Sequence, residues 1–452
     1  SVKAAVEKAE MEEGDMVMLN DPFSGGTHLP DITLVAPVMD SRGKPLFYAA
    51  NRAHHSDVGG ISPGSMPLSE SIFQEGIIIP PVKIVSKGSL NRDILNLVMS
   101  NVRTPLEREG DFTAQIMANM TGIRRIKELL ANCGTEALLQ YSREIIDYSA
   151  RMVEQVVSAL PDGNYFFEDC LDDDGQGAAR IPIVLNLEIS GSRAVLDFSQ
   201  SADQVRGCVN AVRSITLSCV LYVFRCLVRD DIPANSGCLA PLKVITRKGS
   251  VVDALFPCAV AGGNVETSQR IVDVILGALA QASTDSIPAA SQGTMNNMAM
   301  GGFDPYKGQP FTYYETLAGG MGASCRGQGA SAVHSHMTNT LNTPVEALEH
   351  SYPLLVREYS LRKDSGGSGQ HCGGDGLVRE LEPLCSCEIS ILSERRCIAP
   401  YGILGGEAGK TGKNLIYRNG RWHAAPGKFQ DRLKPGERLR IMTPGGGGYG
   451  PA

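Results

Sequence analysis

The sequence predicts a mixed α/β protein of the α+β type, built from several domains. Its 452 residues exceed what one hydrophobic core usually serves. Apolar residues recur at helical spacing in one long block, whereas short strand-like runs lie before and after it. We therefore expect a strand-rich region over 1–90, a helical block over 91–160, an α/β middle domain over 161–349 and a β-rich region over 350–452.

The strand-rich region begins with a helical pattern in residues 1–11. Three apolar runs follow at residues 16–19, 32–38 and 46–50, separated by turn signals. Successive short strands of this kind are typical of an antiparallel sheet. The segments that follow the first and third runs would then lie at one edge of that sheet.

The helical block carries isoleucine, leucine and valine at spacings of three and four residues. Gly122 and the pair Cys133-Gly134 are expected to interrupt the pattern, and Pro161 and Gly163 to end it. Beyond Gly163, the apolar runs predict further elements. Strands are expected at 165–168, 181–189, 194–199, 312–317, 377–382, 387–393, 414–417 and 438–442, and helices at about 209–228 and 266–282.

Charge and cysteine usage exclude several classes of protein. The net charge is -7 and no basic block occurs, which argues against nucleic acid or an anionic membrane as the partner. The 12 cysteines lack disulfide or zinc-finger spacing, and the sequence shows no signal peptide and no apolar run of membrane-spanning length. These features favour a reducing compartment, and we expect a cytoplasmic protein.

Glycine is in excess, with 50 of 452 residues, or about 11% against a typical level of about 7%. The glycines cluster without a repeat period, which indicates tight turns and close backbone approach. The cluster at residues 365–376 has the composition of a phosphate-binding loop but lacks its Gly-Lys-Ser/Thr ending. We expect a structural role for it.

Two glycine-rich segments, residues 20–31 and 51–60, are the best candidates for chemistry. They hold three of the eight histidines, and an aspartate follows in each segment; these residues are His28, Asp31, His54, His55 and Asp57. Pro30 opposes a helical pairing of His28 with Asp31 and favours a turn that aims both side chains inward. Two imidazoles with one or two carboxylates suit Mn, Zn or Fe with positions open to substrate. Spacing alone leaves the choice between His54 and His55 open.

Other segments carry weaker signals, each with a structural alternative. Residues 172–174 are three aspartates, which could hold magnesium but are better interpreted as an acidic turn. Gly262-Gly263-Asn264 precedes an apolar helix. The segment could bind an anion at the N-terminus of this helix, or the helix could simply begin with Thr267 or Ser268 as its N-cap. His334 and His336 alternate as on a strand, with metal binding the less favoured interpretation, and Cys238 and Cys325 lack a neighbouring base in sequence.

The longer motifs resemble a known family, the hydantoinase B/oxoprolinase family, over essentially the whole chain. The matching stretches begin with Asn20-Asp21-Pro22, Pro30-Asp31 and Asn51-Arg52-Ala53-His54-His55. They continue with Pro63-Gly64-Ser65-Met66-Pro67, Phe73-Gln74-Glu75-Gly76, Asn101-Val102-Arg103-Thr104-Pro105, Leu171-Asp172-Asp173-Asp174-Gly175, Gly262-Gly263-Asn264-Val265-Glu266-Thr267-Ser268-Gln269-Arg270, Asn339-Thr340-Leu341-Asn342-Thr343-Pro344-Val345-Glu346 and Pro444-Gly445-Gly446-Gly447-Gly448-Tyr449-Gly450.

The resemblance implies a B-type subunit that works in a hetero-oligomer with an ATP-binding hydantoinase A-type subunit. Such assemblies open cyclic amides (hydantoin, 5-oxoproline, lactams) with ATP, and related ones carboxylate ketones such as acetone or acetophenone. ATP and magnesium are then expected in the partner. The resemblance assigns the metal to His28, Asp31 and His54, leaves Asp57 as a supporting residue, and implies a further acidic ligand upstream of Ser1.

Overall fold

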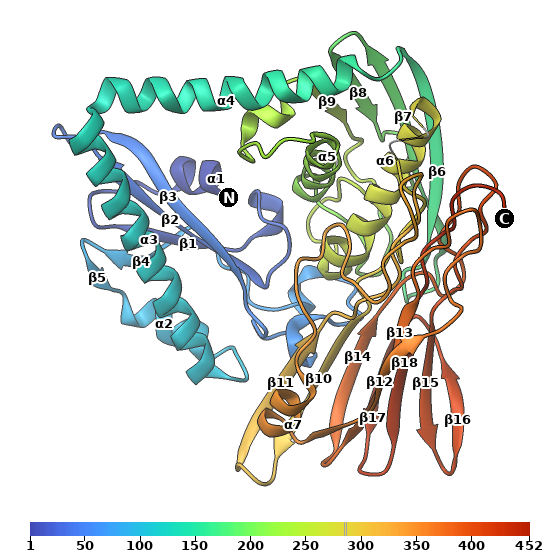
Figure 1. Ribbon diagram of the computed structural model, residues 1–452. Helices are drawn as coiled ribbons and strands as arrows, with labels where there is room; N and C mark the ends of the chain where they lie inside the picture. Colours follow the sequence, from blue (N-terminus) through green and yellow to red (C-terminus); the bar gives the residue numbers. More distant parts are fainter. Residues whose placement is uncertain (284, 286) are drawn as a thin grey trace.

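The computed structural model describes residues 1–283, 285 and 287–452 (Figure 1). These residues form four β-sheets and seven α-helices, and the predicted mixed α/β class is confirmed. The N-terminal sheet lies on one side of the molecule in Figure 1, and the three other sheets lie together on the opposite side.

The N-terminal sheet is antiparallel with the strand order β3-β2-β1-β4-β5. Its strands are β1 Met16–Leu19, β2 Asp31–Met39, β3 Pro45–His54, β4 Val82–Ser86 and β5 Ser89–Leu90. Helix α1 (Val2–Lys8) packs Ala5 against one face of β1 and β2, and helix α3 (Pro105–Cys133) covers β2 and β3 from the other face. Strand β2 is buried along almost its whole length because it is covered on both faces.

The helical block consists of α2 (Arg92–Met99), α3 and α4 (Thr135–Ser158). The expected interruption at Gly122 was wrong, since α3 continues through it. A Cβ added at Gly122 would lie 3.4 Å from the Cβ of Ala49, so this glycine allows close packing of α3 on β3. Gly134, at φ +77°, does separate α3 from α4, and α4 then runs as a strut towards the second sheet (Figure 1).

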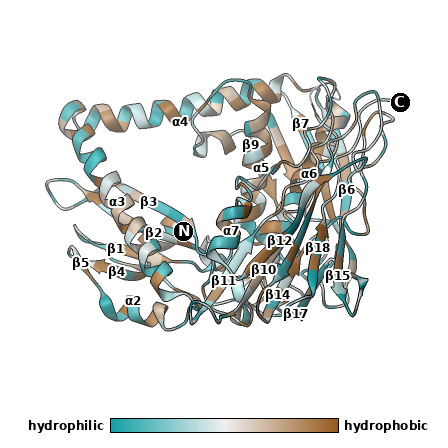
Figure 2. Cartoon of the chain, turned by 60° about the horizontal axis from the view of Figure 1, so that its bottom comes forward, coloured by the Kyte–Doolittle hydropathy of each residue, from teal (hydrophilic) through white to brown (hydrophobic). Residues whose placement is uncertain are grey.

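The second sheet has the order β6-β7-β8-β9, with β8 and β9 parallel. Its strands are β6 Gly163–Asp173, β7 Ala179–Ser190, β8 Arg193–Asp197 and β9 Leu242–Ile245. Helix α5 (Arg213–Leu227) lies in the connection between β8 and β9, and α6 (Ser268–Ala282) packs on β6 and β7. Hydrophobic residues concentrate along α5 and α6, whereas hydrophobic and hydrophilic residues alternate along α4 (Figure 2). Helix α6 is accordingly buried on every side from Ser268 to Leu279.

Two antiparallel sheets complete the chain, in the orders β11-β10-β14-β17 and β12-β13-β18-β15-β16. Their elements are β10 Asn297–Asp304, β11 Gln309–Glu315, β12 Leu354–Arg362, β13 Gly376–Pro383, β14 Cys387–Leu392, β15 Lys413–Arg418, β16 Arg421–Ala425, β17 Lys428–Leu433 and β18 Arg438–Met442, with helix α7 at Val345–Ser351. The first of these sheets therefore combines strands from both sides of residue 350.

Above these sheets, five segments, four of them rich in glycine, pack directly through their backbones. We call residues 289–292, 319–323, 365–374 and 403–409, arranged around 444–450, the glycine bundle. The central segment is hydrogen-bonded to each of the other four; for example, the Gly446 N–H donates to Gly374 O at 2.9 Å and the Gly447 N–H to Ala290 O at 2.8 Å. A Cβ at Gly446 would lie 2.0 Å from Met321 O. The phosphate-loop-like segment is thus part of a backbone scaffold.

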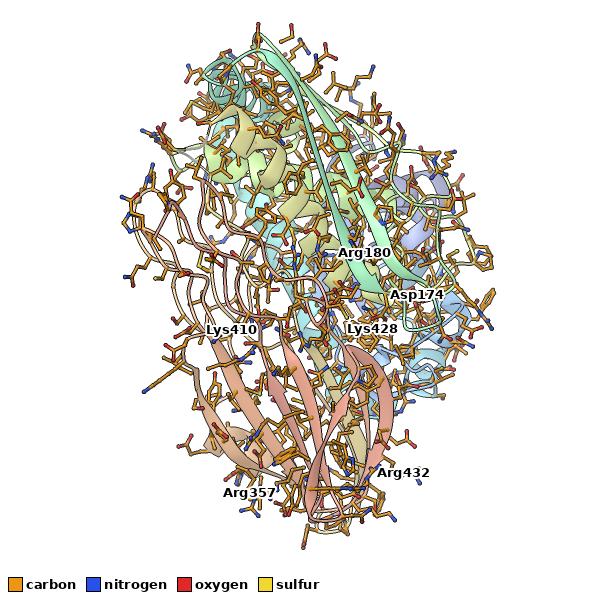
Figure 3. The ribbon with its side chains drawn as sticks, turned by 90° about the vertical axis from the view of Figure 1, so that its right-hand side faces the viewer. Asp174, Arg180, Arg357, Lys410, Lys428 and Arg432 are labelled. Carbon is orange, nitrogen blue, oxygen red and sulfur yellow. The ribbon has the colours of Figure 1, made fainter. Side chains whose placement is uncertain are left out.

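A set of charged side chains is buried between α6, β6 and β17, and we call it the buried ionic cluster. Its members are Asp169, Arg270, Asp273, Glu394, Arg395 and Lys428. Lys428 Nζ lies 2.5 Å from Glu394 Oε1, and Arg395 Nη2 lies 2.7 Å from Asp169 Oδ2. Figure 3 shows Lys428 where β6 and β7 meet the C-terminal sheets.

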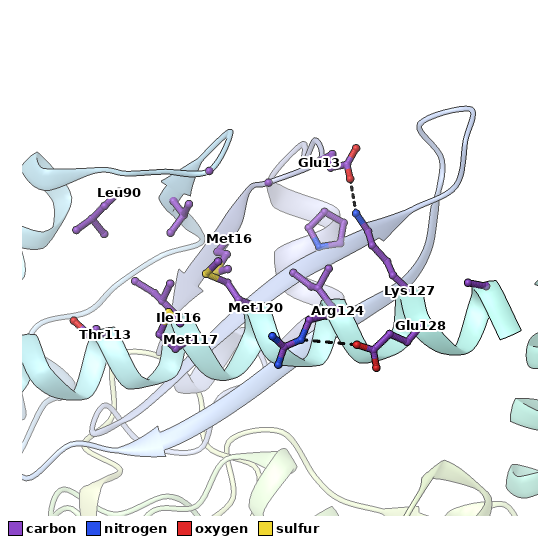
Figure 4. A pocket seen from close by; sticks show the side chains of 16 residues that line it. Glu13, Met16, Leu90, Thr113, Ile116, Met117, Met120, Arg124, Lys127 and Glu128 are labelled. Carbon is purple, nitrogen blue, oxygen red and sulfur yellow. Dashed lines mark hydrogen bonds and ion pairs between the residues drawn. The ribbon is translucent and has the colours of Figure 1, made fainter.

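A groove of about 770 Å³ lies between α3 and the N-terminal sheet (Figure 4). Its sheet side is formed by the part of the sheet that α3 does not cover. The groove is lined by apolar residues such as Met16, Leu90 and Met120, with an exposed Lys127–Glu13 ion pair of 2.6 Å at its rim. No histidine or cysteine is among its lining residues.

All 12 cysteines lie among the described residues and are free thiols. Within the described ranges, no helix is both long enough and apolar enough to cross a membrane.

Candidate metal centre

Strand register brings Asp31 and His54 together. Asp31 is the first residue of β2, His54 is the last residue of β3, and the two are directly paired across the antiparallel ladder. Directly opposed residues project from the same face of a sheet, and the next residue along a strand projects from the other. His54 therefore shares the face of Asp31, whereas His55 cannot.

His28 reaches the same point from the turn that precedes β2. Gly25 takes φ +87° there, and a Cβ at Gly26 would lie 2.7 Å from Asp21 O, so both glycines are needed for the tight loop. The buried Asn20 side chain holds this loop by donating to Leu29 O at 2.9 Å and accepting from the Ile79 N–H at 2.7 Å. The backbone that carries His28 is thus fixed independently of any ligand.

The geometry of the three side chains fits a bound divalent metal. His28 Nδ1 lies 3.1 Å from Asp31 Oδ2, His54 Nδ1 lies 3.3 Å from Asp31 Oδ1, and one ligand atom from each residue lies within 4.8 Å of the others. Two ligand atoms that share one ion at about 2.1 Å lie about 3.0–3.4 Å apart. His28 Nδ1 is buried and forms no well-aligned hydrogen bond, although Asp31 Oδ2 lies 3.1 Å from it. Across residues 1–283, 285 and 287–452, no second group of this kind occurs.

Asp31 supplies the negative charge of the site. Burial acts to raise the pKa of this carboxyl, but the His28 and His54 imidazoles outweigh burial and hold the pKa well below its usual range. The Thr27 hydroxyl donates to Asp31 Oδ2 at 2.5 Å and orients the carboxylate. Asp31 is therefore an ionised group aimed between two histidines.

The other two candidates in these segments lie apart from this centre. His55 is buried against α3, where its Nε2 lies 2.9 Å from Gln115 Oε1 and its ring contacts Phe112. Asp57 accepts two hydrogen bonds from Arg103, one from its backbone N–H at 2.7 Å and one from Nη1 at 2.8 Å. Both side chains support the loops rather than face His28, Asp31 and His54.

Two residues from distant parts of the chain complete the walls of the site. Asn264 lies in a π-helical turn, Gly263–Thr267, and its Nδ2 is 3.5 Å from His28 Nε2. The ring of Tyr314, on β11, lies 5.2 Å from that of His54. Asn264 belongs to a stretch that the sequence already singled out, and π-turns are frequent at functional sites. No sequence pattern pointed to Tyr314.

The weaker candidates have structural partners of their own. Asp172 accepts from the backbone N–H groups of residues 396, 397 and 398, and Asp174 from those of residues 176, 178 and 207. Thr267 stands at the start of α6 but makes no capping hydrogen bond. His336 is buried beside Tyr222, with Nδ1 3.4 Å from its hydroxyl, and neither His334 nor His336 joins the group formed by His28, Asp31 and His54.

Comparison with known proteins places this geometry in a family. The family model described as Hydantoinase B/oxoprolinase matches residues 1–452. A 5-oxoprolinase of Dictyostelium discoideum is 39% identical over all of this chain and 35% of its own length. An uncharacterized protein of Methanocaldococcus jannaschii is 39% identical over 98% of this chain and 77% of its own length. The chain thus spans about a third of the length of the 5-oxoprolinase that it matches.

Solved structures agree with this assignment. The ATP-dependent caprolactamase of Pseudomonas jessenii superposes with a TM-score of 0.91 at 27% identity, covering 99% of this chain and 79% of that one. A nucleotide-free acetone carboxylase shares the fold, with a TM-score of 0.89 at 17% identity over 98% of this chain and 66% of that one. The predicted resemblance is therefore confirmed, and the chain belongs to the hydantoinase B/oxoprolinase family.

Proposed function

We propose that this chain is the metal-dependent B-type subunit of an ATP-dependent cyclic-amide hydrolase. The observation that carries the proposal is the convergence of His28, Asp31 and His54, with an ionised carboxylate between two imidazoles. Members of the family and a solved relative are named for the opening of cyclic amides, as 5-oxoprolinase and caprolactamase. A hydantoin, 5-oxoproline or another lactam is accordingly the proposed substrate class.

In this proposal, His28, Asp31 and His54 hold one Mn, Zn or Fe ion. When bound, such an ion would polarise a carbonyl or lower the pKa of a water molecule. Thr27 keeps the Asp31 carboxylate in its orientation, and Asn264 lies against the ring of His28. The Tyr314 hydroxyl stays protonated beside the site, since burial and the negative charges of Glu266 and Asp31 raise its pKa. Asn264 and Tyr314 are therefore uncharged walls of the site, which suit an uncharged amide.

ATP binding is assigned to an A-type partner subunit, so the active assembly is a hetero-oligomer. The one segment with phosphate-loop composition is packed into the glycine bundle, where its backbone is hydrogen-bonded to neighbouring segments. The length of the 5-oxoprolinase relative beyond the matched third leaves room for an ATP-binding part. We also propose a cytoplasmic location, which the 12 free thiols support.

The second candidate is a subunit of an ATP-dependent ketone carboxylase. It is favoured by the fold shared with acetone carboxylase, and the same three ligands would serve either reaction. The purified complex of this chain with its ATP-binding partner should be assayed with ATP and 5-oxoproline, hydantoin or caprolactam. Parallel assays should use ATP with acetone or acetophenone and bicarbonate. Ring opening without bicarbonate supports the hydrolase, and ketone consumption that requires bicarbonate would replace it with the carboxylase.

A further inference from the structure

We propose that Tyr314 is a positioning residue for the metal centre, and that its aromatic ring holds His54 in the orientation that binds metal. This inference rests on the metal site of the proposed function. It concerns a residue more than 250 positions away from His54 in the chain, on a different sheet.

His54 needs support that its own strand does not give. It is the last residue of β3, an edge strand, and its side chain is 34% exposed, against 1% for His28. Its only hydrogen-bonding partner among the described residues is the Asp31 carboxylate, at 3.3 Å. A side chain at a strand end with one weak polar contact keeps much of its rotational freedom.

The ring of Tyr314 supplies that support by its contact with the His54 ring. The His54 ring neighbours two others, with its centroid 5.2 Å from that of His28 and 5.2 Å from that of Tyr314. The interplanar angle is 28° for the His28–His54 pair, which is stacked, and 30° for the His54–Tyr314 pair, which is tilted. Aromatic rings at such distances attract one another. Tyr314 therefore limits rotation of His54 away from Asp31.

Tyr314 can act in this way because it is itself fixed from several sides. Its hydroxyl donates to Asn297 Oδ1 at 2.7 Å, and Asn297 Nδ2 donates to the buried carboxylate of Glu266 at 2.7 Å. The turn at Gly64 lies over it, since a Cβ added there would be 3.7 Å from the Tyr314 Cβ. The rest of the side chain packs against a small hydrophobic cluster that includes Met66 and Leu392. The ring thus has a fixed place before any metal binds.

One consequence is that the metal centre joins two sheets. His54 ends an edge strand of the N-terminal sheet, and Tyr314 lies on β11, an edge strand of the sheet β11-β10-β14-β17. A metal ion that immobilises His54 would restrict the motion of β11 as well. Metal binding and the packing of these two edge strands are therefore expected to depend on each other.

The test uses the full chain, stripped of metal with a chelator and then titrated with Zn²⁺ by calorimetry and with Co²⁺ by visible absorption. Tyr314→Leu removes the aromatic face and should weaken binding of both ions about 10-fold or more, with an altered Co²⁺ spectrum. Tyr314→Phe retains the ring and should stay within about threefold of wild type. Tyr313→Leu is the matched control, because Tyr313 projects from the opposite face of β11 and packs against Tyr352.

Several outcomes would overturn the inference. These are wild-type affinity in a folded Tyr314→Leu protein, an equal loss in Tyr314→Phe, or an equal loss in Tyr313→Leu. Should Tyr314→Leu fail to fold, hydrogen exchange of the wild-type chain decides instead. Zn²⁺ should then slow exchange in β11 as well as at the end of β3, and unchanged exchange in β11 would refute the coupling. If the wild-type chain bound neither ion, the proposed metal site itself would fail, which separates the two proposals.

Discussion

Asp31 and His54 face each other across the ladder between β2 and β3, and their side chains meet at 3.3 Å. Twenty-three residues of sequence separate them, but the pairing of two adjacent strands brings them together. A shift of register by one residue would place His55, rather than His54, opposite Asp31 and reverse the faces of both histidines. The candidate site is thus a property of the sheet as much as of its loops.

The first prediction concerns metal content. The purified wild-type chain should carry about one divalent ion per chain. His28→Ala and Asp31→Asn should bind Zn²⁺ more weakly than wild type by about 100-fold or more, because each removes a proposed ligand. Elemental analysis and calorimetry provide the measurement. His423→Ala, which changes a histidine on β16 remote from the site, is the control, and an unaltered metal content in His28→Ala would rule out the ligand assignment.

The second prediction separates His55 from His54. His55→Ala should lower the free energy of unfolding by about 1–3 kcal/mol, since it leaves the buried Gln115 amide without its imidazole partner. Zn²⁺ affinity should remain within a few-fold of wild type. Urea denaturation and calorimetry measure the two quantities. A loss of affinity as large as that of His28→Ala would return His55 to the set of metal ligands.

The third prediction concerns Glu75, a fully buried carboxyl that accepts hydrogen bonds from Ser69 and from the Val260 and Ala261 N–H groups. Burial raises its pKa from 4.5 to about 7, despite these hydrogen bonds. The folded state therefore binds this proton more tightly than the unfolded state. Its contribution to stability is present below about pH 4.5 and is lost as the pH rises through about 7.

Glu75→Gln removes this titration and keeps an oxygen for the same donors. The quantity to compare is the free energy of unfolding of the variant minus that of wild type. This difference should be larger by about 2–3 kcal/mol at pH 8 than at pH 4.5. Urea denaturation at both pH values gives the difference directly. A stability difference between variant and wild type that does not change with pH would show that Glu75 does not titrate in this range.

The fourth prediction concerns the buried ionic cluster. Lys428→Met leaves the fully buried Glu394 with one partner fewer. It should therefore lower the free energy of unfolding by about 3–5 kcal/mol. Replacing both residues, as Lys428→Met with Glu394→Gln, should recover part of that loss. Arg432→Met is the control on the same strand. It breaks the exposed pair of Arg432 with Glu388 and should cost less than about 1 kcal/mol in urea denaturation.

Local patterns in the sequence predicted the fold class and the elements that bury a regular apolar face. Apolar runs marked β1, β2, β7 and β14, and helical spacing marked α3 and α4. Sequence patterns did not predict β12 and β17. These strands contain many polar or charged residues, so they lack a clear alternation of apolar and polar positions. Gly122 was misjudged because its effect comes from a neighbour, Ala49, that sequence order does not reveal.

The residues of the candidate site also fall into those that the sequence could predict and those that only the structure reveals. His28, Asp31 and the two candidate histidines stand in recognisable segments, so the sequence was enough to propose them. The choice of His54 on geometric grounds needs the strand register, which single-sequence patterns do not provide. Asn264 and Tyr314 reach the site only through tertiary packing of α6 and β11. Their roles could be inferred only after the strands and helices had been placed.

The glycine bundle has a consequence for the order of events during synthesis. Residues 444–450 are the central segment, and four earlier segments form hydrogen bonds to it. Those four emerge from the ribosome before the segment around which they assemble. The contacts that close this part of the molecule therefore form only after residue 450 has been translated. Until then, the nascent chain must carry the four segments with these backbone groups unpaired or bonded to water.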